Sequence, residues 1–478
     1  MHLSEMQIYI NSMNNKASSQ KTDTDSQMFN YFSQLKKKVI YLGTQIKLAM
    51  SYPEQLLHYI WKYKLYANSE FLSIENEEIE ILDTGMLNVN AGPDFFNAKI
   101  KIGSKTWAGN IEIHKASSDW KKHKHHTDPA YNSIILHVVE LRDCDIFTQE
   151  GRKIPQIAIK IPDNVAANYS QLLSSNFAIP CDNKLKDIPK IHLNNWLSGL
   201  LVERLERKTN DIYTLLDKFN NSWDETFYVL LARNFGFGLN SDVFERLALS
   251  LPYFYIQKHS DDIFQVEALL FGQAGLLEDD FILEDYFLQL KREYRFLRKK
   301  YTLNNLDGFL FKSLRVRPQG FPQVRIAQLA AVLQQSKRLF SHVLEKEDEN
   351  MLRLFFHINA SEYWQTHYTF GKTSNKKTKY PGDASINVIL INTIVPILFA
   401  YGKRNNIEKY CTRALSILED LKPERNSIVR EFKKFGISPL NAADTQALIQ
   451  LRKEYCNQHK CLYCKVGYQI LSGKMDAV

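Results

Sequence analysis

One stretch with alternating apolar residues, 90–114, constrains the fold of this chain more than any other. Apolar residues alternate on both sides of a tight Gly103-Ser104 turn, which predicts a β-hairpin. Successive residues of a strand face opposite sides of a sheet, so Glu112 and His114 share one face of the second strand. Asp94 stands at the start of the first strand. The hairpin therefore predicts two carboxylates, Asp94 and Glu112, on neighbouring strands.

Paired carboxylates on adjacent strands suit a hard divalent cation. Mg²⁺ takes oxygen ligands, and one or two protein carboxylates often suffice when phosphate and water supply the others. We therefore expect Asp94 and Glu112 to bind Mg or Mn, which would activate a water molecule. His114 follows Glu112 by two positions and is the candidate to orient that water or to stabilise the scissile phosphate.

The pattern Pro93-Asp94 followed by Glu112-Ile113-His114 resembles the PD-(D/E)xK nuclease superfamily. The resemblance implies a metal-dependent nuclease that hydrolyses phosphodiester bonds of DNA or RNA, with Asp94, Glu112 and His114 as catalytic residues. His114 stands where the superfamily usually carries lysine, and the two side chains differ in charge and geometry. The alternative is therefore a catalytically inactive nuclease-like protein that binds nucleic acid or acts as a scaffold.

The sequence around the hairpin predicts the elements of an α/β domain. A capped helix is expected over 51–65 and a strand over 79–82, before the hairpin. A short helix at 117–120 and strands over 133–139 and 156–161 are expected after it. This order agrees with the helix, three strands, helix and strand (αβββαβ) of the restriction-endonuclease-like core that the resemblance implies.

Composition divides the chain into four parts. Residues 1–49 are a polar extension that we expect to be poorly ordered, so the functional chain would start at Met50. Residues 50–165 form the α/β domain, and 166–189 read as a linker. In 190–478, apolar stripes at helical spacing dominate. The sequence thus predicts an α/β N-terminal domain followed by an all-α C-terminal domain.

A histidine-rich basic run, 120–128, directly follows the hairpin. Three interpretations stay open: its lysines contact phosphate, its histidines and an aspartate bind zinc in a different metallohydrolase, or it is a solvated helix end. His137, within a buried strand, is expected to be a core histidine rather than a ligand. The candidates for phosphate contact are Lys121, Lys122 and Lys124. The candidates for the zinc site are His123, His125 and Asp128.

A second basic segment, 311–325, is rich in arginines, prolines and aromatic residues, and we expect it to be extended rather than helical. Arginines beside aromatic rings suit contact with phosphates and bases. The alternative is that the arginines connect helix ends. The candidates for contact with nucleic acid are Arg315, Arg317 and Arg325.

Two glycine-containing segments, 234–238 and 271–275, do not follow a strand in a βαβ setting. A nucleotide-binding glycine loop needs that setting. We therefore predict close helix packing and turns at both segments.

Three of the six cysteines, Cys456, Cys461 and Cys464, crowd near the C-terminus with Cys-x4-Cys-x2-Cys spacing. Thiolates this close commonly share a metal, so the spacing predicts zinc or an iron–sulfur cluster. The spacing leaves the fourth ligand open. Some nucleases of the superfamily named above hold an iron–sulfur cluster with one remote and three C-terminal cysteines, a layout that Cys181 and the C-terminal cysteines resemble. The candidates for the fourth ligand are His459, Cys181, Cys411 and Cys144.

Charge and hydropathy limit which partners and which cellular compartment we expect for this chain. The chain has 61 Lys and Arg against 53 Asp and Glu, a net +8 that is compatible with nucleic acid. The cysteines do not form a disulfide pattern, and no signal peptide is visible, so we expect a cytoplasmic protein. The most hydrophobic run, 386–401, contains asparagines and a proline, so we expect a buried helix and no membrane partner.

From residue 50 onward the chain also resembles a family of uncharacterised proteins from Bacteroidetes and relatives, known only as a domain of unknown function. The resemblance rests on His114–Trp120, the His-x-His run, Leu270–Gly275 and the closing cysteines. It implies no activity.

Overall fold

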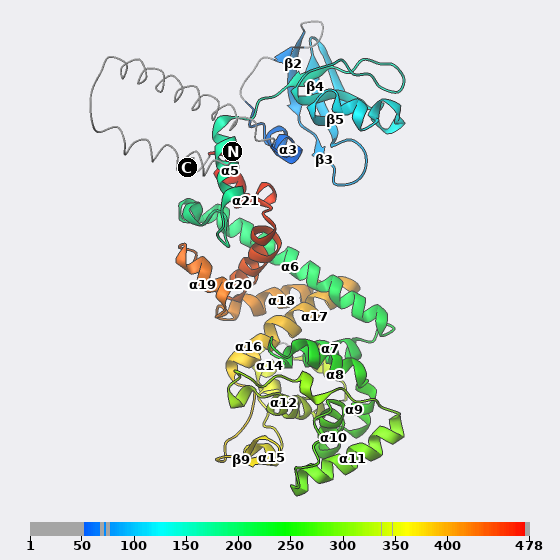
Figure 1. Ribbon diagram of the computed structural model, residues 1–478, viewed down its shortest axis with the longest axis vertical. Helices are drawn as coiled ribbons and strands as arrows, with labels where there is room; N and C mark the ends of the chain where they lie inside the picture. Colours follow the sequence, from blue (N-terminus) through cyan, green and yellow to red (C-terminus); the bar gives the residue numbers. More distant parts are fainter. Residues whose placement is uncertain (1–51, 67–70, 73–76, 336, 347, 474–478) are drawn as a thin grey trace, which may run out of the picture. The chain divides into compact units, whose positions relative to one another are not determined.

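The computed structural model describes residues 52–66, 71–72, 77–335, 337–346 and 348–473. The chain divides into two compact units, unit 1 ending at Asp163 and unit 2 beginning at Asn164. The predicted extension at 1–49 and the predicted start at Met50 lie outside the described residues. A mixed β-sheet region with few helices is followed by a largely helical region (Figure 1), which confirms the predicted fold class.

Unit 1 is built on one mixed β-sheet (Figure 1). Its strands are ordered β1-β2-β4-β5-β6-β7, with β3 paired to β4. The pairs from β1 to β5 are antiparallel, and β5 runs parallel to β6, as β6 does to β7. The strands are β1 Phe71–Leu72, β2 Glu78–Asp83, β3 Met86–Leu87, β4 Phe95–Ile102, β5 Lys105–Ala116, β6 Ile134–Leu141 and β7 Gln156–Ala158.

The predicted hairpin is present as β4 and β5, which turn at Gly103 with a φ of +56°. The alternation of side chains along β5 holds, but residues 111–114 are buried on both faces. The reason is the position of β5 between β4 and β6, where helices cover the sheet. The face expected to be open for chemistry is therefore largely enclosed.

Two helices of unit 1 pack against β5. Helix α3, Glu54–Lys62, packs on β5 and buries Trp61, whose indole N–H donates to the carbonyl of Thr84 at 3.0 Å. Helix α4, Asp119–Lys122, buries Trp120 within an apolar cluster of unit 1. The short 3-10 helices η1, His125–Thr127, and η2, Pro129–Tyr131, then lead into β6. These elements follow one another in the predicted order.

Among its described residues, unit 2 is helical apart from one small hairpin, β8 and β9, that the sequence does not predict. Its helices range in length from four to 29 residues. They are α5 Asp163–Ser174, α6 Lys190–Lys218, α7 Trp223–Phe235, α8 Ser241–Ser250, α9 Tyr253–His259, α10 Ile263–Gln273, α11 Asp285–Tyr301, α12 Pro322–Gln334, α13 Leu339–Glu345, α14 Glu349–Phe356, α15 Glu362–Gln365, α16 Asp383–Ile389, α17 Val395–Asn405, α18 Glu408–Asp420, α19 Ser427–Lys434, α20 Ala442–Gln450 and α21 Lys465–Ser472. The shorter elements are η3 Asp182–Asp187, η4 Gly308–Leu310, η5 Pro318–Gly320, β8 His367–Thr369, β9 Lys372–Thr373, the π-helical turns η6 Leu390–Ile394 and η7 Leu451–Tyr455, η8 Cys456–Gln458 and η9 Cys461–Tyr463.

The segment predicted as a linker, 166–189, is instead folded. It contains most of α5 and all of η3. The Asn168 side chain donates to the carbonyl of Ile470 in α21 at 3.0 Å and accepts from Lys184 Nζ at 2.8 Å. The polar composition that suggested a linker belongs to the outer face of a packed helix.

The most hydrophobic run of the sequence forms α16, η6 and α17. Among the described residues, this run, Asp383–Asn405, is the one helical stretch long and apolar enough to cross a membrane, and 67% of its most apolar window is buried inside the protein. The prediction of a buried helix is confirmed.

Helix α6 joins the early and late parts of unit 2 through buried polar contacts. The Arg204 Nε donates to Gln446 Oε1 of α20 at 2.6 Å, and the amide of Gln450 donates to Glu203 Oε1 at 2.9 Å. One turn further along α6, Lys208 Nζ donates to Asn392 Oδ1 of η6 at 3.0 Å. Satisfied polar groups of this kind favour one packing arrangement because any other leaves them unpaired.

The enclosed Lys208 predicts a pH-dependent stability. Burial lowers the pKa of Lys208 to about 7, with the charge of the nearby Arg204 contributing. Because the folded pKa lies below the unfolded value, the stabilising contribution is complete above about pH 10.4 and is lost as the pH falls through 7. We expect the free energy of unfolding to fall by about 3 kcal/mol more between pH 9.5 and pH 7 in the wild type than in Lys208→Met. Urea denaturation at both pH values measures this difference, with the exposed Lys403→Met as the control. An identical pH dependence in wild type and Lys208→Met would contradict it.

Candidate functional site

The structure brings Asp94 and Glu112 together at the open end of the hairpin. Phe95 pairs with Ile111, so the two acidic residues lie opposite each other. The Asp94 N–H donates to Glu112 Oε2 at 3.1 Å, and the Ile113 N–H donates to Asp94 Oδ2 at 2.9 Å. Each strand thus fixes the carboxylate of the other.

The two carboxylates differ in burial. The side chain of Glu112 is 6% exposed and that of Asp94 is 23% exposed. Burial raises the pKa of Glu112, and the charge of Asp94 raises it further. In the absence of a cation, Glu112 therefore retains a proton more readily than an ordinary glutamate, and a bound cation would displace that proton.

Three histidines gather beside Glu112, and we refer to His114, His123 and His125 as the histidine cluster. One ring nitrogen from each lies within 4.8 Å of the others. His114 Nε2 lies 3.1 Å from His123 Nδ1 and 3.6 Å from Glu112 Oε1. His125 Nε2 lies 3.3 Å from the same Glu112 oxygen. Four ligands at 2.0–2.1 Å around a tetrahedral ion are separated by about 3.4 Å, so these spacings fit one ion.

The local chain path explains how the His-x-His run reaches β5. Helix α4 ends after Lys122, and Lys124 adopts a left-handed conformation with a φ of +64°. This turn starts η1 at His125, whose ring stacks on Tyr131 with the ring centres 3.9 Å apart. The run therefore folds back so that the rings of His123 and His125 lie beside His114 of β5.

A chain of hydrogen bonds behind the cluster sets the protonation of His114. Gln156 Nε2 donates to the carbonyl of Cys144 at 3.0 Å, so its Oε1 accepts from His137 Nδ1 at 3.3 Å. His137 Nε2 must then accept from His114 Nδ1, which lies 2.8 Å away. This arrangement leaves the His114 Nε2 lone pair facing Glu112 and His123, in the form that binds a metal.

Burial keeps both inner histidines neutral. It lowers the pKa of His114 to about 2, with the neighbouring His137 contributing, and lowers the pKa of His137 to about 4. The prediction that His137 is a core histidine agrees with its complete burial and its hydrogen bond to Gln156.

Sequence reasoning missed two residues of this site, Glu54 and His58. Both lie on α3, one turn apart, and His58 Nε2 is 3.3 Å from Asp94 Oδ2. Burial lowers the pKa of His58, but the hydrogen bond and charge of Asp94 outweigh burial and raise it. Burial also raises the pKa of Glu54, which the charge of Asp94 raises further. The i, i+4 spacing of the two residues is the signal that could have found them.

The other candidate residues of the histidine-rich run are not part of the histidine cluster. Asp128 does not join the histidine cluster: its Oδ1 caps η2 by accepting from the Ala130 N–H at 2.9 Å. The carboxylate beside the histidine cluster belongs to Glu112, whereas the zinc site predicted from the sequence had Asp128 in this role. The lysines considered for phosphate contact are all exposed beside the cluster. They are Lys121, Lys122 and Lys124.

The arginines of 311–325 belong to unit 2, and one of them is structural. Arg325 lies over the Phe237 ring, 4.1 Å from its centre, and donates to Gln328 Oε1 at 2.9 Å. Arg325 therefore fits the alternative interpretation of this segment, in which its arginines connect helix ends. Arg315 and Arg317 are exposed.

Comparison with known proteins gives a family but no function. A family model described as "Protein of unknown function (DUF2851)" matches residues 54–427. No curated protein and no solved structure matches the chain. The match includes the whole site of unit 1 and ends before the three C-terminal cysteines.

Proposed function

The chain belongs to the DUF2851 family of proteins of unknown function, and we propose that it is a metal-dependent nuclease whose ion is held by Glu112 and the histidine cluster. One observation carries the proposal: a single oxygen, Glu112 Oε1, lies 3.6 Å from His114 Nε2 and 3.3 Å from His125 Nε2. Asp94, whose N–H donates to the other oxygen of Glu112, Oε2, supports a second acidic group near the ion.

The donor set favours particular metals. Imidazole nitrogens suit zinc, iron and related transition metals, whereas Mg²⁺ prefers oxygen ligands. Of the two metals expected from the carboxylates alone, Mn²⁺ is therefore favoured over Mg²⁺, and Zn²⁺ is the further candidate. The neutral state of His114 supports this assignment because a protonated imidazole cannot bind a cation.

The chemistry follows from the ion and its two carboxylates. A bound transition metal lowers the pKa of a coordinated water and offsets the charge that develops on a phosphate. Asp94 is the more exposed carboxylate and would orient the attacking water, with His58 as its partner. His114 would act as a ligand, because its side chain is only 1% exposed and cannot reach a substrate.

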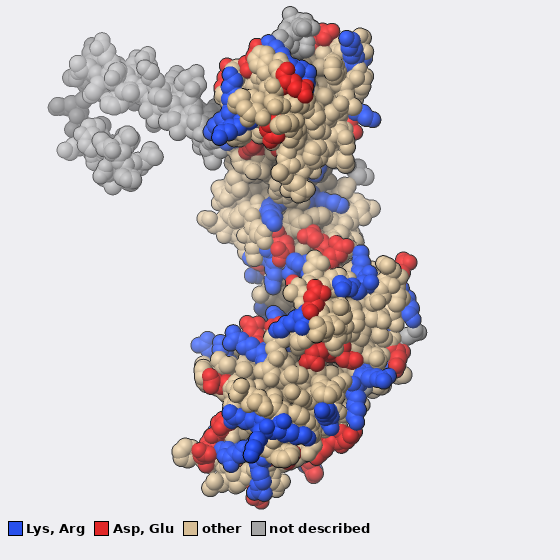
Figure 2. All heavy atoms as spheres, turned by 90° about the vertical axis from the view of Figure 1, so that its right-hand side faces the viewer, with Lys and Arg blue, Asp and Glu red and all other residues tan. Residues whose placement is uncertain are grey.

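A phosphodiester substrate is supported by the surroundings of the site. The order α3, then β2, β4 and β5, then α4 and β6, with Asp94 and Glu112 on adjacent strands, supports the resemblance to PD-(D/E)xK nucleases. Exposed lysines flank the cluster. Figure 2 shows Lys and Arg interspersed with Asp and Glu on the visible face, so we expect local contact with a nucleic acid strand rather than a broad basic surface. All six cysteines are unpaired, which supports the proposed cytoplasmic location.

The test is cleavage of labelled single- and double-stranded DNA and RNA by the full chain with Mn²⁺, Zn²⁺ or Mg²⁺. We expect cleavage with at least one metal and none with excess chelator. The double variant Asp94→Asn, Glu112→Gln should be inactive, whereas His126→Ala, an exposed neighbour outside the cluster, should match the wild type. Full activity of the double variant would refute the site. If the protein binds nucleic acid in a salt-dependent manner but cleaves it with none of these metals, the alternative of a nucleic-acid-binding protein holds instead.

Replacing Gln156 tests the hydrogen-bond chain behind the ion. Gln156→Leu removes the acceptor that fixes the His137 ring and, through it, the His114 tautomer. Loss of such an outer partner typically lowers metal affinity by about 10- to 100-fold, and we expect an effect of this size. Competition with a chromophoric chelator measures the affinity, and Gln149→Leu, at an exposed position of the same unit, is the control. Unchanged affinity in Gln156→Leu would show that the chain does not position His114.

A further inference from the structure

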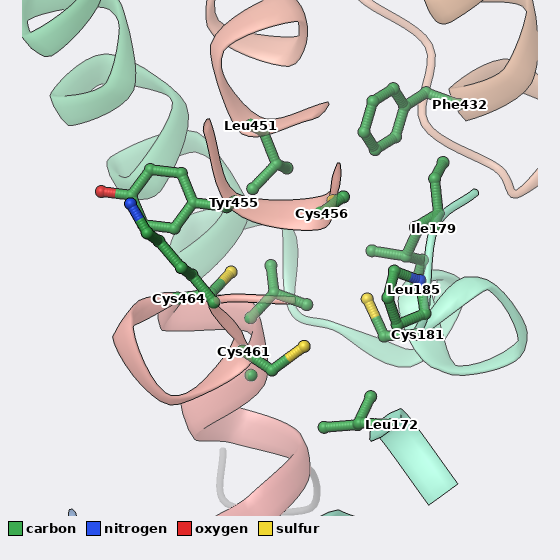
Figure 3. A pocket seen from close by; sticks show the side chains of 14 residues that line it. Leu172, Ile179, Cys181, Leu185, Phe432, Leu451, Tyr455, Cys456, Cys461 and Cys464 are labelled. Atoms are coloured by element: carbon green, nitrogen blue, oxygen red, sulfur yellow. The ribbon is translucent and has the colours of Figure 1, made fainter. Parts of the chain in front are cut away.

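Four cysteines from distant parts of the sequence line one cavity of unit 2 (Figure 3). The first stands directly before η3, and the other three belong to η8, η9 and the N-cap of α21. The cavity wall between them is apolar and includes Leu172, Ile179 and Phe432. The four cysteines are Cys181, Cys456, Cys461 and Cys464.

We propose that these four thiols bind an iron–sulfur cluster. The site lies in the helical unit and is independent of the nuclease proposal, because no residue of unit 1 takes part in it. The structure selects Cys181 as the fourth ligand that the sequence spacing left open. A [4Fe–4S] cluster takes four cysteine ligands, so the donor set is complete. Transfer of a preformed cluster would exchange its four bonds to carrier ligands for four Fe–S bonds to the cysteines, and each departing carrier ligand would take up the proton that a thiol loses.

The other candidates for the fourth ligand are elsewhere. His459 is exposed. Cys411 packs against α17, where its thiol donates to the carbonyl of Phe399 at 3.7 Å. Cys144 belongs to unit 1, with which the cavity shares no residue.

Burial in the cavity that they share raises the pKa of all four thiols. Burial raises the pKa of Cys181 well above its usual range, and the thiols of Cys464, Cys456 and Cys461 raise it further. Burial likewise raises the pKa of Cys461 to about 11, with the Cys464 thiol contributing. Thiols in such an apolar cavity stay protonated and unreactive unless a metal draws off their protons.

The backbone around Cys464 is arranged to support a thiolate. The N–H groups of Gly467 and Val466, at the start of α21, lower the pKa of the Cys464 thiol and so oppose the larger effect of burial. Gly467 also allows the helix to approach η9 closely, since a Cβ there would lie 2.0 Å from the carbonyl oxygen of Cys461. Hydrogen bonds to sulfur are among the features that tune iron–sulfur centres.

The spacing of the sulfurs favours a cluster over a single zinc ion. Four sulfurs at about 2.3 Å from one tetrahedral zinc lie about 3.8 Å apart. Among the described residues, the histidine cluster has three ligand atoms within 4.8 Å of one another, whereas no three of these sulfurs do. A polynuclear cluster spans a wider set of thiolates than one ion does.

The test uses the full chain, purified without air and, if needed, reconstituted with iron and sulfide. We expect about four iron and four acid-labile sulfide per chain and a visible absorption that bleaches on reduction. Cys181→Ser should lose most of the iron, whereas Cys411→Ser should retain it. Retention of the full cluster by Cys181→Ser would overturn the assignment. Neither iron nor sulfide in the wild type, or zinc alone, would also overturn it.

Alkylation of the wild-type protein keeps the proposal testable if Cys181→Ser does not fold. Mass spectrometry should show the four cavity cysteines protected from iodoacetamide in the loaded protein and labelled once the iron is removed. Cys144 and Cys411 should be labelled equally in both states. Equal labelling of all six cysteines in both states would overturn the proposal.

Discussion

Glu112→Gln should lower the rate of metal-dependent cleavage by about a thousandfold or more. Glutamine preserves the size of the side chain but cannot supply the negative charge that Glu112 Oε1 places between His114 and His125. A catalytic metal contributes several kcal/mol to stabilisation of the transition state, and about 4 kcal/mol corresponds to a thousandfold in rate. The loss should therefore appear in the turnover rate and in metal content together.

Stability separates this effect from unfolding. Burial and the charge of Asp94 raise the pKa of Glu112, so a neutral amide at this position relieves a buried, repelled carboxylate. We expect the metal-free variant to be at least as stable as the wild type in urea denaturation. Cleavage by Glu112→Gln within about tenfold of the wild type would contradict the assignment of Glu112 as a ligand.

Gly275→Ala should destabilise unit 2 by about 3 kcal/mol or more. Gly275 has a φ of +69°, and a Cβ there would lie 2.0 Å from the carbonyl oxygen of Leu306 and 2.8 Å from the amide nitrogen of Gly308. Both obstacles are backbone atoms, which cannot rotate away as a side chain could. The chain after α10 and the chain after α11 would have to separate, although the Leu306 N–H donates to the carbonyl of Gln273 at 2.8 Å.

Gly199→Ala is the matched control for this prediction. Gly199 lies within α6, and a Cβ there meets nothing within 4 Å. Alanine should stabilise the helix by about 0.5–1 kcal/mol because it has less conformational freedom to lose. Urea denaturation of both variants measures the contrast. Similar stabilities for Gly275→Ala and Gly199→Ala would show that the close backbone approach is not required.

Local periodicity explains why much of unit 1 was predictable. The hairpin and its Gly103-Ser104 turn follow from alternation and turn chemistry, which depend only on neighbouring residues. The pairing that sets Asp94 opposite Glu112 does not follow from this turn alone, because the register shifts by one residue between Phe95 and Ala98. The burial of both faces of β5 was not predictable in this way, because it depends on how β6 and α3 pack.

The histidine cluster required tertiary structure. Spacing within the run suggested His123 and His125 but wrongly added Asp128, which is nearer in sequence than Glu112. The left-handed turn at Lys124 brings the run back to β5, and no sequence rule predicts such a turn at a lysine. Glu54 and His58 were missed because their partner, Asp94, lies far away in the sequence.

In unit 2, the helical character was predictable, whereas contacts between segments far apart in the sequence were not. Cys181 was one of several candidates until α5 and η3 proved to be folded against the C-terminal helices. The polar composition of 166–189 wrongly suggested a linker, because a packed helix can have a polar outer face.

The contacts of α6 with α20 bear on where the chain can be cut. A fragment that ends at residue 427, where the family match ends, would lack α20 and α21. It would leave Arg204 and Glu203 without Gln446 and Gln450, and it would uncover apolar side chains of α6. Newly uncovered apolar surface of this kind promotes aggregation. The smallest autonomous form of unit 2 therefore extends beyond the family boundary, through the closing helix.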